Sequence, residues 1–175
     1  VAPEKDSETM LRALQILLSE GRRVWLLHRS GGYEQLLREA RHIGVVDRVI
    51  ATDAKHPLGG LAFDYQASDV CVQASREEGL GFSPLEALAC GIPVVASAVG
   101  GLRETIVDGE TGWSYPVGEP SSLARCIAAA LDDPEEGRRR AAAGRALVLK
   151  RFERGMVFDR LEAVLLGTPR PPQAP

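Results

Sequence analysis

The chain has 175 residues, of which 45% are apolar and 26% are charged, which suits one globular domain with a buried core and excludes a disordered tail. Its 21 basic and 24 acidic residues give a formal charge of −3, so electrostatics offers no reason to expect a nucleic-acid partner. No apolar run approaches the roughly 18 residues of a membrane-spanning helix, and no secretory leader opens the chain, so we expect a cytoplasmic protein.

Cysteine and histidine spacing argues against disulfides and metal sites. The three cysteines are far apart and form no C-x-x-C pair, which favours a reducing compartment. The three histidines share no i, i+4 spacing, so we interpret them as surface residues rather than metal ligands. The residues concerned are Cys71, Cys90, Cys126, His28, His42 and His56.

Apolar periodicity, followed in chain order, predicts helices that alternate with short strands. Ser7 is the expected N-cap of a first helix that ends near Gly21, and Pro134 is the expected start of a helix that runs towards Lys150. The other expected helices lie at residues 33–42 and 83–90, around Leu123, Ile127 and Leu131, and at 152–166. The expected strands lie at residues 23–27, 49–51, 70–72 and 93–96.

Most of these strands are continuous apolar runs, which is typical of strands that helices cover on both faces. The alternation predicts an α/β fold, a Rossmann-like doubly wound parallel sheet flanked by helices. We assign residues 1–166 to this domain, with Trp113 and Tyr115 in its core, and residues 167–175 to a Pro-rich tail. The arginine-rich stretch at residues 138–151 is interpreted as a solvated helix face, with contact to a phosphate or an anionic membrane as the alternative.

Residues 74–96 carry the chemistry, in the order strand, Gly-rich loop, helix and strand. Gly79 and Gly81 let the backbone approach a ligand closely. Ser83 is the expected cap of the helix, and Pro84 suits its first position. Unpaired N–H groups at such a terminus, together with the helix dipole, favour an anion and most naturally a phosphate.

Two carboxylates flank this anion site. Glu78 precedes the loop, and Glu86 lies in the first turn of the helix. Carboxylates accept paired hydrogen bonds from vicinal hydroxyls, so a phosphate between two of them matches a nucleotide sugar, with ribose on one side and hexose on the other.

The segment EGLGFSPLEALACGIPVVAS, with its E-x7-E pair, resembles the donor-site signature of the family-4 (group 1) retaining glycosyltransferases. Blocks of the form GG-x-x-E and D-G-x-x-G follow at residues 100–104 and 108–112, and residues 2–5 are similar to the family's P-E-K-G segment. The resemblance covers roughly residues 1–165. It implies a GT-B architecture, of which this chain is similar to the C-terminal, donor-binding half.

The resemblance also implies roles for particular residues. Glu78 would contact hydroxyls of the donor hexose, and Glu86 those of the ribose. Lys5 would neutralise the diphosphate, which makes Lys5 and Glu78 the catalytic candidates. The backbone of Gly79, Gly81, Phe82 and Ser83 would contact sugar and diphosphate, and the loop at Thr52 and Asp53 would flank the base. No metal or other cofactor is obligatory in the family.

The sequence departs from the family in three places. The family's Gly-Arg pair and first strand would precede residue 1, and the acceptor domain is also absent, so we expect an upstream chain or partner domain. The turn after the second strand contains Arg29, interpreted as an exposed loop residue, with a phosphate contact as the alternative. Glu104 is interpreted as a helix cap, with a position facing the site as the alternative.

The sequence predicts the donor domain of a retaining hexosyltransferase, with three alternatives left open. Another GT-B enzyme, such as a nucleotide-sugar epimerase or a phosphorylase, would need acid–base or cofactor-binding residues that no motif indicates. A non-catalytic nucleotide-binding module remains an alternative because the acceptor half is missing. Self-association and peripheral contact with the inner face of the membrane are compatible with the sequence.

Overall fold

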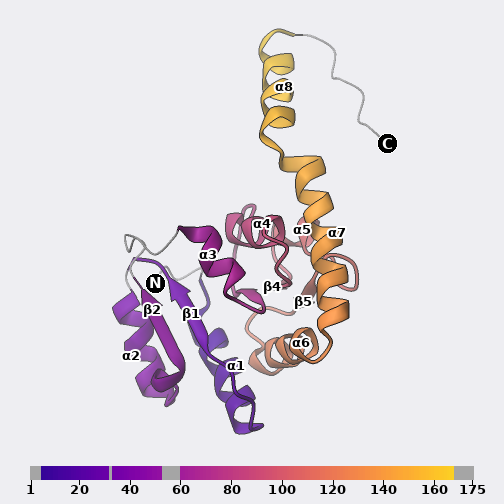
Figure 1. Ribbon diagram of the computed structural model, residues 1–175. Coiled ribbons are helices and arrows are strands. Elements are labelled where there is room, and N and C mark those ends of the chain that lie inside the picture. Colours follow the sequence, from indigo (N-terminus) through magenta and orange to yellow (C-terminus); the bar gives the residue numbers. More distant parts are fainter. Residues whose placement is uncertain (1–4, 32, 53–59, 168–175) are drawn as a thin grey trace.

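The computed structural model describes residues 5–31, 33–52 and 60–167 (Figure 1). The helices are α1 (Ser7–Ser19), α2 (Tyr33–Ile43), the 3₁₀ helix η1 (Val46–Arg48), α3 (Leu61–Gln66), α4 (Phe82–Ala89), α5 (Leu102–Thr105), α6 (Pro120–Asp132), α7 (Pro134–Phe152) and α8 (Arg154–Leu165). The strands are β1 (Leu26–Arg29), β2 (Val49–Thr52), β3 (Cys71–Gln73), β4 (Val94–Ser97) and β5 (Trp113–Tyr115).

All pairings between these strands are parallel, as expected, but they form two sheets rather than one. β1 pairs with β2, with Leu26 opposite Val49, and β4 lies between β3 and β5 in a three-stranded sheet. Within the described ranges no strand joins β1 to β3. The resemblance implies a central strand that precedes residue 1, and a strand between β1 and β3 would unite the two sheets.

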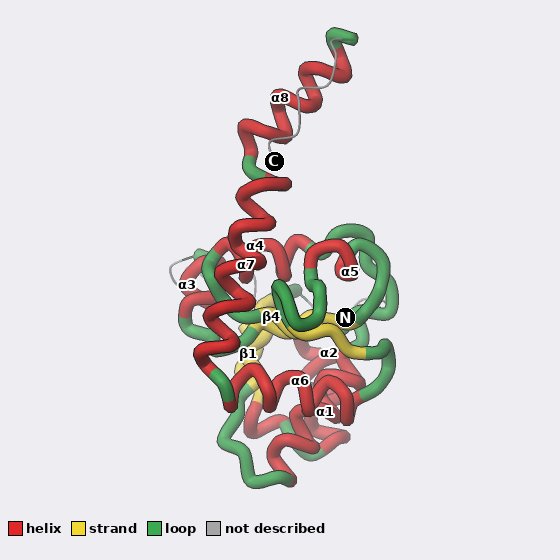
Figure 2. Tube along the Cα trace, turned by 90° about the vertical axis from the view of Figure 1, so that its right-hand side faces the viewer, coloured by secondary structure: helices red, strands yellow, loops and turns green. Residues whose placement is uncertain are grey.

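Two layers of helices enclose the strands, which confirms the expected α/β class (Figure 2). On one side α1 packs against α6 and α2, and on the other α4 packs against β3 and α7. All four positions of β4 are buried, because successive side chains enter the cores on opposite faces. Trp113 and Tyr115 are buried in the core that includes α1 and α6, so the expectation for both aromatics is confirmed.

The first helix has a different cap from the one expected. Asp6 is the N-cap of α1, and its carboxylate accepts from the Thr9 backbone N–H at 3.4 Å and the Thr9 hydroxyl at 2.8 Å. The Asp6 backbone N–H donates to the Ala74 carbonyl at 3.0 Å, which fixes the chain one residue before the expected cap. Ser7 is the first residue of α1 and donates from Oγ to Glu39 at 2.6 Å.

Strand β1 lies further along the chain than the expected residues 23–27. Trp25 precedes it and is 58% exposed, with the Arg48 guanidinium 4.8 Å from its ring centroid. Arg29 is the last residue of β1 and is paired with Asp64 of α3. The apolar run at residues 24–27 is therefore only partly strand, because within the described ranges no strand pairs with its first half.

The arginine-rich stretch lies on α7, and several of its side chains make specific contacts with the rest of the domain. Arg140 donates to the Gly112 carbonyl at 2.8 Å, and its guanidinium lies 4.1 Å from the centroid of the Trp113 ring. Arg145 donates to the Ala89 carbonyl at 3.0 Å. The expected solvated face is thus also a surface that holds α7 on β5 and α4.

Helix α8 extends away from the body of the domain (Figure 1). The expected terminal helix is confirmed, but Glu153 separates it from α7 and caps α8 by accepting from the Met156 N–H at 3.1 Å. The Pro-rich tail lies outside the described residues, apart from Gly167. In the part of the chain that the structure describes, no helix is both long and apolar enough to cross a membrane.

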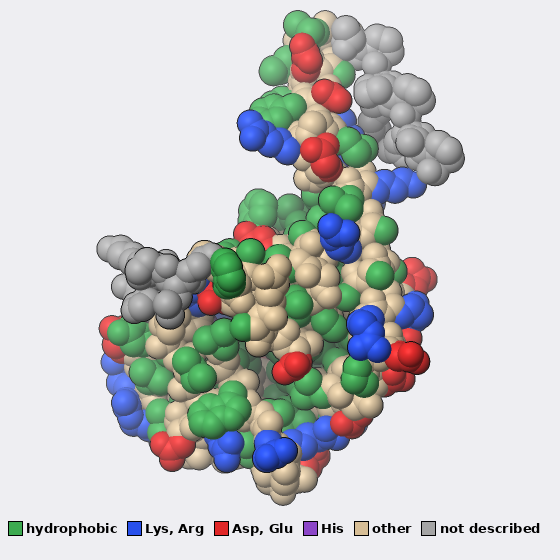
Figure 3. Space-filling view, in the orientation of Figure 1, with side chains coloured by type: hydrophobic (Ala, Val, Ile, Leu, Met, Phe, Trp, Pro, Cys, Tyr) green, Lys and Arg blue, Asp and Glu red, His purple; other side chains and the backbone are tan. Residues whose placement is uncertain are grey.

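The separated sheets lead to a prediction about self-association. β1 and β3 each have an edge without a partner strand among the described residues. The apolar side chains of Trp25, Leu27 and Ile50 are exposed, and Leu27 lies opposite Ile50. Figure 3 shows hydrophobic side chains gathered on the part of this face that lies over β1 and β2. Unpaired edges and apolar patches promote association. We expect residues 1–175, purified alone, to form oligomers in light-scattering measurements. A monodisperse monomer with a cooperative melt would contradict this prediction.

Candidate functional site

The site forms where β3 and β4 end and α4 begins. The chain leaves β3 at Gln73, passes through the Gly-rich loop and starts α4 at Phe82. Gly81 is the N-cap residue, with a left-handed φ of 81°. A Cβ at this position would also lie 2.5 Å from Leu102 Cδ2, so both the turn and the packing require glycine.

This geometry corrects three expectations about the helix start, one of which is that Glu86, the fifth residue of α4, lies beyond its first turn rather than in it. Ser83 is the second residue of α4 rather than its cap, and Pro84 is the third residue rather than the first. The left-handed turn at Gly81 begins the helix without a side-chain cap. Pro84 is tolerated because backbone N–H groups in the first turn have no intrahelical partner. The anion-binding character of the terminus is retained, since it depends on those N–H groups.

Glu78 is held by two donors. Lys5 Nζ donates to Glu78 Oε2 at 2.5 Å, and Gln73 Nε2 lies 3.3 Å from the same oxygen. The backbone of Lys5 forms a bridge with Ser75, which places the lysine beside the exit of β3. The structure therefore brings the two expected catalytic candidates into one ion pair.

A buried network beneath the loop fixes the ends of β3 and β4. Gln73 Nε2 donates to Ser75 Oγ at 2.7 Å. The Ser75 N–H donates to Ser97 Oγ at 3.1 Å, and the Ser97 hydroxyl donates back to the Ser75 carbonyl at 2.7 Å. Sequence reasoning missed these three residues, although the position of Gln73 at the end of an apolar strand was a signal that could have indicated the first of them.

The loop that carries Glu78 and Gly79 rests on the two glycines of the G-G-x-x-E block. The Gly101 N–H donates to the Glu78 carbonyl at 3.2 Å. A Cβ on Gly100 would lie under 3.0 Å from the Glu78 carbonyl oxygen, and one on Gly101 would lie equally close to that of Gly79. The paired glycines are thus needed so that two backbone segments can touch.

Glu86 has a different partner from Glu78. The Tyr65 hydroxyl donates to Glu86 Oε2 at 2.9 Å, and burial, followed by this hydrogen bond, raises the pKa of Tyr65. Burial, followed by the nearby Glu86 carboxylate, raises the pKa of Cys71 to about 12. Tyr65 therefore acts as a donor at neutral pH, and Cys71 is a protonated thiol rather than a nucleophile.

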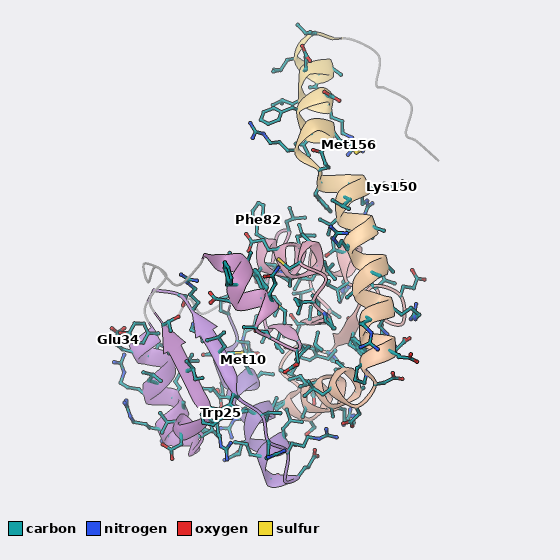
Figure 4. All side chains as sticks on the ribbon, viewed as in Figure 1. Met10, Trp25, Glu34, Phe82, Lys150 and Met156 are labelled. Carbon is teal, nitrogen blue, oxygen red and sulfur yellow. The ribbon has the colours of Figure 1, made fainter. Side chains whose placement is uncertain are left out.

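The remaining expected site residues are spread more widely. Phe82 is 73% exposed and points away from the body of the domain at the start of α4 (Figure 4). Ser83 is exposed beside it. Thr52 ends β2 in the other sheet, and Asp53 lies outside the described residues.

Two further expectations are wrong. Arg29 is not an exposed loop residue, because it belongs to β1 and its side chain is only 13% exposed beside Asp64. Glu104 makes no side-chain cap, since α5 begins at Gly101 without one and Glu104 is exposed.

Over the described ranges, no group of three or more His, Cys, Asp and Glu side chains is placed to hold a metal ion. His28 is half-buried, with Nε2 2.7 Å from Ser30 Oγ, whereas His42 is exposed on α2. His56 lies outside the described residues. The charged groups at the site are therefore carboxylates, a lysine and a helix terminus, which together suit an anion flanked by hydroxyl groups.

A separate groove of about 550 Å³ runs between α1 and α2 from Lys5. Its charged side chains largely neutralise one another, because Arg12 pairs with Glu8 at 2.8 Å and Arg76 pairs with Asp6 at 3.2 Å. The groove shares Lys5 with the site at the start of α4.

Comparison with known proteins assigns the chain to a family. The family described as glycosyl transferases group 1 matches residues 1–147. A D-inositol 3-phosphate glycosyltransferase of Xylanimonas cellulosilytica is 38% identical over 155 residues, covering 85% of this chain and 36% of the relative. A GDP-mannose-dependent α-(1-6)-phosphatidylinositol monomannoside mannosyltransferase of Mycolicibacterium smegmatis is 31% identical over 176 residues, covering 95% of this chain and 46% of the relative.

The fold agrees with this assignment. The structure of HepE from Anabaena in complex with UDP-glucose superposes with a TM-score of 0.85 at 22% identity, covering 95% of this chain and 46% of that one. The chain thus spans less than half of the length of these three relatives, and it has the architecture of the C-terminal half of a GT-B enzyme. The chain belongs to the group 1 glycosyltransferases.

Proposed function

We propose that this chain binds the nucleoside diphosphate sugar donor of a retaining hexosyltransferase, at the start of α4. The observation that carries the proposal is the placement of Lys5, Glu78 and Glu86 around a helix N-terminus. A cation and free N–H groups there suit a diphosphate, and the two carboxylates have separate partners and so suit separate sets of hydroxyls.

In this proposal Lys5 bridges Glu78 and the diphosphate. An ammonium group has three donors, so pairing with Glu78 Oε2 leaves capacity for phosphate oxygens. Lys5 and the N–H groups of Phe82 and Ser83 would stabilise the negative charge that develops on the departing nucleoside diphosphate. Glu78 would orient the hexose, Glu86 the ribose and the end of β2 the base, while no metal is assigned a role.

Relatives support the class of donor without fixing its identity. The M. smegmatis relative uses GDP-mannose by its name, and the HepE structure contains UDP-glucose. Apart from the end of β2, which is assigned to the base, the residues assigned above would contact groups that are common to both ligands. We therefore propose a nucleoside diphosphate hexose as donor and a separate acceptor domain as partner, and place the reaction in the cytoplasm.

The test is a calorimetric titration of residues 1–175 with UDP, GDP, ADP and their glucose or mannose conjugates. We expect the ligands that carry one of the three bases to bind, and we expect no hexose transfer to an added acceptor. Transfer requires the acceptor to be held in reach of the anomeric carbon, and such positioning contributes several kcal/mol to catalysis. If the folded chain bound none of these ligands, the donor-site proposal would fail. Rapid transfer by residues 1–175 would contradict the proposed need for an acceptor domain.

A further inference from the structure

Helix α3 connects the two sheets through two side-chain contacts that are adjacent in sequence. Asp64 forms an ion pair with Arg29 at the end of β1, with the two side chains 28% and 13% exposed. The next residue, Tyr65, donates to Glu86 Oε2 on α4 at 2.9 Å. Figure 1 shows α3 between β1 and α4. The helix therefore reaches from the β1–β2 sheet to the carboxylate assigned to the ribose.

The contact between Tyr65 and Glu86 restricts how that carboxylate is presented. Glu86 is exposed on α4, where its side chain has rotamer freedom. Tyr65 engages one of its two oxygens, and the partly buried Tyr65 ring packs against the core cluster that includes Leu85 and Leu88. A donor fixed by ring packing holds the exposed carboxylate in one orientation and leaves its second oxygen available to a ligand.

We propose that Tyr65 is a positioning residue for the nucleotide ribose, acting through Glu86, and that the Arg29–Asp64 pair sets the position of α3 and hence of Tyr65. The inference rests on the proposed function, because it takes Glu86 as the carboxylate that binds the ribose hydroxyls. Through α3, the β1–β2 sheet would then contribute to donor recognition, although none of the described residues of that sheet is assigned to the ribose.

Tyr65→Phe isolates this role, since it keeps the packed ring and removes only the hydroxyl. The measurement is calorimetric titration with the nucleoside diphosphate that the chain prefers and with its 2′,3′-dideoxy analogue. Hydrogen bonds to a charged group predict that the wild-type chain prefers the ribose form by roughly 10- to 150-fold. We expect Tyr65→Phe to reduce this preference by roughly 3- to 10-fold and to leave affinity for the dideoxy analogue within about twofold, because the packed ring is kept and that analogue offers Glu86 no ribose hydroxyl.

A double-mutant cycle separates positioning through Glu86 from a general structural effect. In a Glu86→Gln background, Tyr65→Phe should cause no further loss of ribose preference, because the group it orients is already altered. Asp64→Asn should lower the preference in the same direction by a smaller factor. Tyr33→Phe is the matched control, since it makes the same chemical change on α2, which packs against α1 and β2, and it should change nothing.

The outcomes distinguish the role proposed for Tyr65 from the proposed donor site itself. A ribose preference that Tyr65→Phe leaves intact would overturn the role of Tyr65 while leaving the donor site in place. Equal losses for the ribose and dideoxy ligands would also overturn it, because they would show a general structural effect. An unchanged preference in Asp64→Asn would remove the Arg29–Asp64 pair from the account. If the wild-type chain bound no nucleoside diphosphate, the proposed function and this inference would fail together.

Discussion

Replacing Gly101 with alanine is expected to weaken nucleoside diphosphate binding by roughly 10- to 150-fold, as for the loss of hydrogen bonds to a charged group. The added Cβ would lie under 3.0 Å from the Gly79 carbonyl oxygen and 3.1 Å from Leu80 Cα, and backbone atoms cannot swing aside as a flexible side chain can. The loop between Glu78 and Gly81 would have to move away from Gly101 and the start of α5. Calorimetric titration measures the loss, and a thermal melt shows whether the domain remains folded.

Gly31→Ala is the matched control for this change. Neither glycine has a positive φ, so alanine introduces no left-handed strain at either position, and a Cβ on Gly31 meets nothing within 4 Å. We expect Gly31→Ala to bind within about twofold of wild type, because surface changes away from such contacts usually alter free energies by less than 0.5 kcal/mol. Wild-type affinity in Gly101→Ala would show that the two glycines do not determine the shape of the loop.

The sequence predicts several helices and strands well, because the signals that mark them are local. The α2 helix and strands β2, β3 and β4 lie within about one residue of their expected positions, where apolar runs are bounded by turn residues. Helices α3 and α5 are too short for periodicity to show, and strand β5 is not a continuous apolar run, because Ser114 separates its two aromatic residues. Strand β5 has only three residues and owes its form to pairing with β4 and to burial of Trp113 and Tyr115.

The residues of the candidate site likewise fall into those that a local pattern predicts and those that only the fold brings together. Glu78, the two loop glycines and Glu86 belong to one continuous motif, so their proximity to a helix N-terminus follows from local rules. Tyr65 lies 21 residues before Glu86, and Lys5 lies 73 residues before Glu78. No local pattern encodes either pairing, and only the resemblance assigned Lys5 to the same site as Glu78. The close approach of Gly101 to Gly79 depends on where β4 delivers the chain, which packing determines.

The second large effect concerns Glu78 and Glu86. Replacing each of them is expected to lower the affinity for a different set of ligands. In the proposed site Glu86 touches the ribose, which both a nucleoside diphosphate and its sugar conjugate contain, so Glu86→Gln should weaken both ligands alike. Hydrogen bonds to a charged group contribute about 1.5–3 kcal/mol, equivalent to a loss of roughly 10- to 150-fold. Glu78 touches only the hexose, so Glu78→Gln should produce a loss of that size for the nucleotide sugar alone.

The pairing of Lys5 with Glu78 strengthens this expectation. Glu78→Gln removes the negative partner of Lys5 and leaves its ammonium group available to the diphosphate. Affinity for the nucleoside diphosphate should therefore stay within about threefold of wild type, and any change should be towards tighter binding.

In the proposed site Glu78 binds the hexose and Glu86 binds the ribose, on either side of the N-terminus of α4. The most direct test of this division is a four-way calorimetric titration, in which Glu78→Gln and Glu86→Gln are each measured with the nucleoside diphosphate and with its hexose conjugate. We expect Glu86→Gln to lower the affinity for both ligands, whereas Glu78→Gln should lower the affinity for the hexose conjugate alone. If folded Glu78→Gln lost both ligands equally, the division would be contradicted, and Glu78 would be a residue that shapes the loop.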